Sequence, residues 1–146
     1  MECSIVDIHT HRPTGKALEP SFAGIHPWQA ETRRIEEIVP RFGEVDLGGE
    51  SGLDYAGTVG REAQLRIFRE QLDWAERLGK PVVLHCVKAF EAVMRELAPH
   101  ALRAVIFHGF IGSSQQAAEA IKKGYYLSFG ERTFRSPRTV EALRRT

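Results

Sequence analysis

Two histidines separated by one residue are the first feature of this sequence that could do chemistry. His9 and His11 follow residues 5–8, a short apolar run that has the composition of a strand. Side chains at positions i and i+2 of a strand lie on the same face, with their bases about 6.5–7 Å apart. Two imidazoles at that spacing can share one metal ion, most typically zinc. The pair indicates a metal site at the end of a strand, although two histidines also fall two apart by chance.

Other residues of the metal-binding kind follow the later apolar runs. Glu50 ends residues 47–50, His85 ends residues 81–85, and His108 ends residues 104–108. His26 follows residues 22–25, so five of the six histidines in the chain come after such runs. Taken singly, each is explained equally well as a hydrogen-bonded structural residue. Together they favour a metal-binding pocket, because one metal centre gives all of these groups a partner.

The residue types limit the metal and the reaction. Histidine together with carboxylate suits zinc or manganese and, with more oxygen ligands, magnesium. Two such ions bridged by a carboxylate can generate hydroxide and clamp a phosphate or a carbonyl during hydrolysis. Glu50 is the natural bridging and catalytic candidate, because it is the only carboxylate at a predicted strand end among the histidines. Trp28, close to His26, could stack on a nucleobase, although packing against the protein is the simpler role.

Short apolar runs alternate with helical patterns along the chain. The sequence predicts strands at residues 5–8, 22–25, 47–50, 81–85, 104–108 and 125–130, and helices at 32–39, 61–78, 89–97, 113–123 and 139–145. The helix at 61–78 has the clearest apolar stripe, with Gly79 as its C-cap. Strands alternating with helices predict an α/β fold with a parallel sheet, in which active sites lie at the carboxyl ends of the strands.

Composition limits the class of protein further. The chain has 146 residues, enough for a single domain over residues 1–146, and its net charge is only +1. That balance does not predict a basic nucleic-acid platform, although a bound metal can supply positive charge locally. Two cysteines, Cys3 and Cys86, with no recognisable leader favour a reducing cytoplasmic location. No apolar run approaches the ~20 residues of a membrane span.

Several short motifs, in order along nearly the whole chain, resemble the TatD-type metal-dependent deoxyribonucleases, which are amidohydrolase-like (β/α)8 barrels. The motifs are Asp7-Ile8-His9-Thr10-His11, Gly24-Ile25-His26-Pro27, Gly49-Glu50-Ser51-Gly52-Leu53-Asp54-Tyr55, Lys80-Pro81-Val82-Val83-Leu84-His85 and His108-Gly109-Phe110-Ile111-Gly112. The helix between the third and fourth motifs also matches, through Gln64, Phe68 and Gln71-Leu72. Each motif is short, but the ordered set is specific.

This resemblance implies a dinuclear centre of two divalent metal ions (Zn, Mg or Mn) that hydrolyses phosphodiester bonds, typically in DNA. It implies the ligands His9, His11, Glu50, His85 and His108, with Glu50 bridging. It also implies that His26 lies near the scissile phosphate. The family often has an arginine at the position of Val87, and Lys88 is the nearest cation here. We therefore expect Lys88 to contact the substrate phosphate.

The sequence also departs from the family pattern. About six of the eight βα units of a TIM-type barrel are present, and the family's later Glu-Thr-Asp motif does not follow Glu131. We expect the chain to be a fragment, or to complete itself by self-association through open sheet edges. Two other functions stay open: a non-catalytic or vestigial metal-binding module, and an amide or ester hydrolase of the same barrel type acting on a small-molecule substrate.

Overall fold

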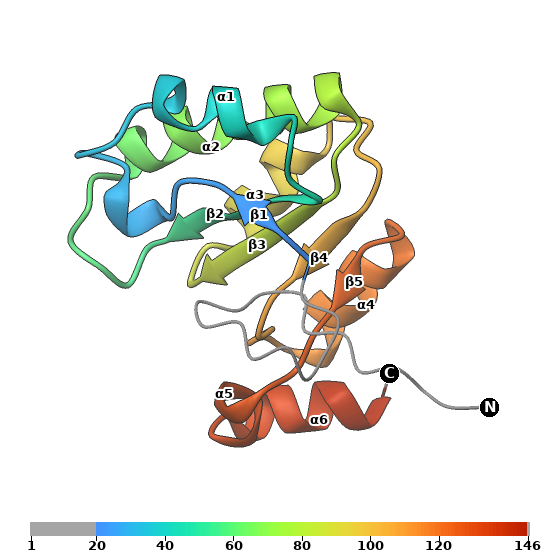
Figure 1. The fold of residues 1–146 in the computed structure, drawn as a ribbon. Helices are drawn as coiled ribbons and strands as arrows, with labels where there is room; N and C mark the ends of the chain where they lie inside the picture. Colours follow the sequence, from blue (N-terminus) through green and yellow to red (C-terminus); the bar gives the residue numbers. More distant parts are fainter. Residues whose placement is uncertain (1–19, 146) are drawn as a thin grey trace.

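The structure is a computed structural model that describes residues 20–145. The predicted strand at residues 5–8, with His9 and His11, lies outside the described residues. Five strands form one parallel sheet in the order of the sequence (Figure 1). They are β1 (Phe22–Ala23), β2 (Leu47–Asp54), β3 (Val82–Val87), β4 (Val105–Phe107) and β5 (Tyr126–Leu127).

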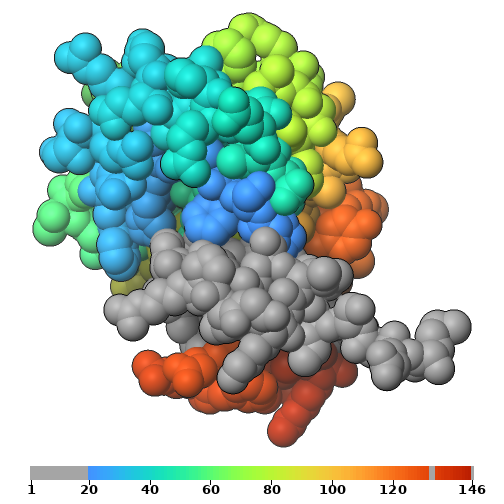
Figure 2. Space-filling view, viewed as in Figure 1, coloured from blue at the N-terminus to red at the C-terminus, as the bar shows by residue number. Residues whose placement is uncertain are grey.

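Helices occupy the connections between these strands, and two more follow β5. They are η1 (Pro27–Gln29), η2 (Ile35–Glu37), α1 (Val39–Phe42), α2 (Arg61–Leu78), α3 (Phe90–Leu97), α4 (Ser114–Lys122), α5 (Glu131–Phe134) and α6 (Pro137–Arg145). In the space-filling view the cyan residues around α1 lie at the top and the orange-red residues of the last helices lie at the bottom (Figure 2). The predicted α/β alternation is confirmed. Among the described residues, no helix combines the length and apolar character that crossing a bilayer requires.

Several elements differ from the sequence-based prediction. The strand predicted at 47–50 extends to Asp54 and is the longest of the described sheet. The helix predicted at 32–39 is only the short turn η2, and α1 begins at Val39 with Pro40 in its first turn, where a missing N–H is tolerated. The strand predicted at 125–130 is reduced to two residues, Tyr126–Leu127. The extension of β2 matters most, because it carries residues of the site.

Helix α2 packs against the sheet and ends where the sequence predicts. Gly79 adopts a left-handed conformation with φ 66°, which glycine takes without strain, and caps the helix. Ile67, Phe68, Leu72 and Ala75 form much of its buried face, whereas Leu78 of the predicted stripe is 39% exposed. Gln64 and Gln71 share the buried face. A purely apolar pattern could not place them, because their polar groups are paired with the backbone.

Gln71 joins α2 to the segment that carries His26. Its Oε1 accepts a hydrogen bond from the Ile25 N–H at 2.7 Å, and its Nε2 donates to the Ile25 carbonyl at 3.1 Å. Replacing Gln71→Leu leaves both buried backbone groups unpaired, which costs about 1–3 kcal/mol for each group. We expect the free energy of unfolding, measured by urea denaturation, to fall by about 2–4 kcal/mol. The matched variant Gln115→Leu, at an exposed position of α4, should change it little; equal effects would contradict this role.

Candidate metal centre

Glu50 lies inside β2, at a bulge. Gly49 pairs with Val83 and Ser51 with Leu84, so Glu50 is the extra residue that the register skips. A bulge of this kind turns a side chain away from the regular alternation of the strand. The prediction that Glu50 ends its strand was therefore wrong: the strand continues to Asp54, and the bulge orients the carboxylate.

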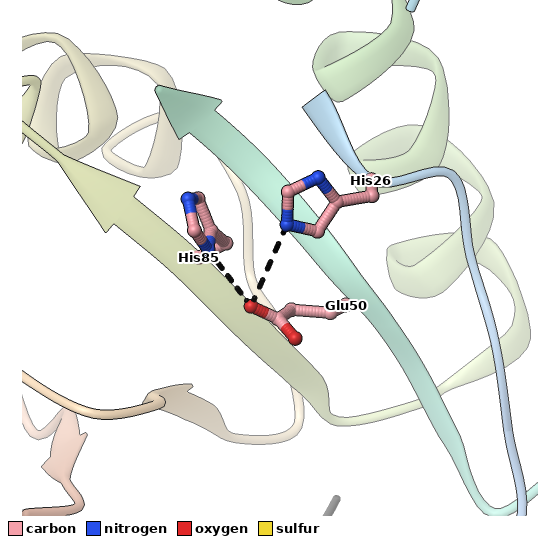
Figure 3. A group of neighbouring side chains, drawn as sticks. All are labelled: His26, Glu50 and His85. Atoms are coloured by element: carbon pink, nitrogen blue, oxygen red, sulfur yellow. Dashed lines mark hydrogen bonds and ion pairs between the residues drawn. The ribbon is translucent and has the colours of Figure 1, made fainter. Parts of the chain in front are cut away.

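His85 on β3 lies between two carboxylates. Its Nδ1 is 2.9 Å from Glu50 Oε1, and its Nε2 is 2.8 Å from Asp54 Oδ2. The His85 residue is buried, with only 5% of its surface exposed. His26 approaches from the loop after β1, with its Nε2 4.0 Å from Glu50 Oε1 (Figure 3). Ligand atoms of His26, Glu50 and His85 all lie within 4.8 Å of one another, close enough to hold one ion.

Gly52 allows the close approach of β2 to β3 at this point. It pairs directly with His85 and has φ 139°, a backbone conformation that side chains disfavour. A Cβ built on Gly52 would lie 2.0 Å from the His85 carbonyl oxygen. The missing side chain is thus what lets the backbone of β3 bring His85 alongside Asp54 and Glu50.

Hydrogen bonds and charges within the site outweigh the effect of burial on the pKa values of His85 and Asp54. Burial alone lowers the pKa of His85, but hydrogen bonds with Glu50 and Asp54 leave that pKa above its ordinary value. Burial raises the pKa of Asp54, whereas hydrogen bonds from His85, Trp28 and the Ala56 N–H bring this pKa below its ordinary value. The site is therefore built to concentrate positive charge between two carboxylates.

His26 has a defined tautomer when it is neutral. It caps η1, and its Nδ1 accepts the Trp28 backbone N–H at 3.1 Å. The proton of the neutral ring then resides on Nε2, the atom that faces Glu50. In this arrangement His26 is a hydrogen-bond donor toward the centre, which suits contact with an anionic substrate better than metal ligation.

Asp54 is the site residue that the sequence interpretation did not single out. Its Oδ2 accepts from His85 Nε2 at 2.8 Å and from Trp28 Nε1 at 2.8 Å, and its Oδ1 accepts from the Ala56 N–H at 3.0 Å. The available signal was its position four residues after Glu50 in the same motif, although the bulge at Glu50 breaks the alternation that would predict a shared face. Carboxylates that accept the second N–H of a metal-binding histidine fix the ring and its tautomer.

Among the described residues, the predicted site residues His108 and Lys88 do not join this cluster. His108 directly follows β4 and donates its backbone N–H to the Leu84 carbonyl at 2.9 Å, which places it beside the strand of His85. It does not belong to the group of three potential ligands found within residues 20–145. Lys88 is exposed, follows β3 and has φ 51°. His9 and His11 lie outside the described residues.

Comparison with known proteins decides the family. The model described as TatD related DNase matches residues 14–146. The chain belongs to this family. Among curated TatD-family relatives, the 3'-5' ssDNA/RNA exonuclease TatD of Citrobacter koseri is 33% identical over 115 residues, covering 73% of this chain and 44% of that protein. An uncharacterized metal-dependent hydrolase of Bacillus subtilis, YabD, is 38% identical over 85 residues, covering 56% of this chain and 33% of that protein.

Solved structures of TatD-family proteins show the same fold. The crystal structure of the Escherichia coli TatD homologue YjjV aligns with TM-score 0.67 and 30% identity, over 75% of this chain and 46% of that one. A TatD-family hydrolase of Entamoeba histolytica aligns with TM-score 0.73 and 17% identity, over 88% and 47% respectively. The described sheet therefore corresponds to part of a (β/α) barrel. The chain spans less than half the length of these relatives.

Proposed function

We propose that this TatD-family chain takes part in metal-dependent hydrolysis of phosphodiester bonds, with DNA as the substrate class. The observation that carries the proposal is the Glu50–His85–Asp54 chain, in which His85 and Asp54 are buried, with His26 beside it where strands β2 and β3 lie together. Buried charged groups persist only when they are paired or bind metal. The family contains nucleases and hydrolases, which supports this class of reaction. Because the chain is nearly neutral, we propose that the bound metal supplies the positive charge that attracts the phosphate.

The donor set fits a divalent ion. Glu50 Oε1 and His85 Nδ1 face one another at 2.9 Å, and Asp54 stands behind His85 as metal-site carboxylates do. We propose two ions (Zn, Mg or Mn), held by His9, His11, Glu50, His85 and His108 with Glu50 as bridging and catalytic residue. A divalent ion held there would polarise the phosphodiester and supply the nucleophile at neutral pH.

The protein's own residues then position the substrate. Asp54 holds the His85 ring in one orientation, and Glu50 supplies negative charge at the centre. His26 carries its Nε2 proton toward the same centre, where it donates to a phosphate oxygen of the substrate. Lys88 is exposed after β3 and contacts a neighbouring phosphate in this proposal. We also propose a cytoplasmic location, which the two cysteines of the sequence favour.

The proposal is tested with the purified chain and a labelled single-stranded oligonucleotide. We expect cleavage in manganese, none after chelation, and recovery when manganese is restored. His26→Asn should lower the rate by about 10²–10⁴-fold, as loss of a proton-donating group does. His100→Asn is the matched control, because His100 pairs with Glu76 away from this cluster. Cleavage that survives chelation, or that both variants retain equally, would reject the proposal.

Asp54→Asn tests the orienting role of Asp54. The amide keeps the shape of the side chain but removes the charge that holds the His85 ring. We expect metal affinity, measured by calorimetric titration with manganese or zinc, to fall about 10–100-fold. Asp73→Asn on the exposed face of α2 should leave affinity unchanged. Unaltered metal binding in Asp54→Asn would remove Asp54 from the site.

A further inference from the structure

Trp28 is a large aromatic residue that the fold leaves in solvent beside the candidate metal centre. It is 59% exposed and does not belong to the set of apolar residues packed around the core. Trp28 is therefore not part of the core, although the edges of its ring contact His26 and His85. An exposed tryptophan needs another reason for its position, because its ring gains little from the protein interior.

The Trp28 ring is nevertheless held in one orientation. Its Nε1–H donates to Asp54 Oδ2 at 2.8 Å, and its backbone N–H donates to His26 Nδ1. Its ring centroid lies 4.6 Å from that of His26 and 5.9 Å from that of His85. Two anchors on the side chain and the backbone remove the rotational freedom that an exposed side chain normally keeps.

Within residues 20–145, the rings that contact Trp28 meet it at steep angles and do not stack on it. The interplanar angles are 66° with His26 and 72° with His85. Trp74 offers a contrast within the same chain, because the guanidinium of Arg77 lies over its ring at 4.8 Å. No cation covers the Trp28 ring in this way within residues 20–145. Trp28 thus offers a rigid aromatic surface to a flat partner from outside.

We propose that Trp28 is a substrate-positioning residue that stacks on an unpaired nucleobase next to the phosphodiester being cleaved. This inference rests on the proposed function. In a nucleotide, one sugar separates the base from its phosphate. Trp28 is in edge contact with His26, which is proposed to donate a hydrogen bond to that phosphate. Stacking on an aromatic side chain tolerates any base but requires the base to be free of a duplex. The residue therefore selects single-stranded substrate without reading sequence.

The test uses Trp74→Phe, in which Trp28 is the only tryptophan. A tetramer of thymidine is compared with an abasic tetramer that has the same number of phosphates, both with phosphorothioate linkages that resist cleavage and both with magnesium present. We expect the thymidine tetramer to quench Trp28 fluorescence and, by anisotropy of labelled oligonucleotides, to bind about 5–150-fold more tightly than the abasic one. Trp28→Ala in the same background should abolish this preference, and Trp28→Phe should restore part of it.

Other results of these binding measurements would contradict the stacking role or the proposed function. A preference for thymidine that persists in Trp28→Ala would overturn the stacking role, as would equal binding of both tetramers by Trp74→Phe. If those results accompany metal-dependent cleavage of oligonucleotides, only the stacking proposal fails. If neither tetramer binds and no cleavage occurs under any metal, the proposed function fails first and the stacking role falls with it.

Discussion

Glu50→Gln is expected to reduce phosphodiester hydrolysis by at least about 10²–10⁴-fold, the range for loss of a catalytic acid or base. Glutamine has nearly the same shape, so the bulge in β2 and the contact with His85 can persist. What disappears is the negative charge that faces His85 and His26. Because the charge is what attracts a divalent ion, metal affinity should fall together with the rate.

Two measurements separate this effect from a general loss of structure. The circular dichroism spectrum of Glu50→Gln should match that of the unmodified chain, and Glu44→Gln, at an exposed position before β2, should keep full activity. Titration with manganese should then show weaker binding in Glu50→Gln alone. Activity within about threefold of the unmodified chain, on the scale where catalytic groups contribute at least 10²-fold, would mean that Glu50 has no catalytic role.

Gly52→Ala is expected to have the largest effect on stability. The new Cβ would meet the His85 carbonyl oxygen at 2.0 Å, and that oxygen belongs to the backbone of the neighbouring strand. Relief requires β2 and β3 to separate where they pair, in a sheet buried on both sides. The residue would also be forced to hold φ 139° with a side chain. We expect the free energy of unfolding to fall by about 4 kcal/mol or more, which is exceptional for one substitution.

Gly43→Ala is the matched control for this variant. Gly43 ends α1 with φ −73°, and a Cβ there meets nothing within 4 Å. Alanine should be neutral or slightly stabilising at this position, because it restricts the unfolded chain without strain. Denaturation midpoints in urea compare the two variants directly. A small, equal effect of both substitutions would show that β2 and β3 tolerate separation at Gly52.

The sequence was sufficient for the order of the described strands and for the meeting of Glu50 with His85. Alternating apolar runs and helical patterns carry that information directly. The bulge at Glu50 could not be predicted, because it is a property of the pairing between β2 and β3. The extension of β2 to Asp54 could not be predicted, because its glycines lower the strand propensity of this segment. Those glycines are nevertheless required, because the neighbouring backbone lies too close for a side chain.

The side-chain contacts of the site were harder to predict from the sequence for a related reason. Gln64 and Gln71 are polar by type but buried by context, since each satisfies backbone groups of a neighbouring segment. The orientation of Trp28 depends on hydrogen bonds to His26 and to Asp54, a residue 26 positions away. Such pairings leave no periodic pattern in the sequence, so side-chain geometry is needed to find them.

The strand order also has a consequence for biosynthesis. Each of the described strands β2 to β5 pairs with the strand that precedes it in the chain. A nascent polypeptide leaving the ribosome can therefore add one strand and its helix at a time, and no described strand has to wait for a distant partner. At each stage of synthesis the last strand to be added has one unpaired edge, which is prone to aggregation until the next strand pairs with it. We expect chaperones that shield nascent strands to bind the chain during translation.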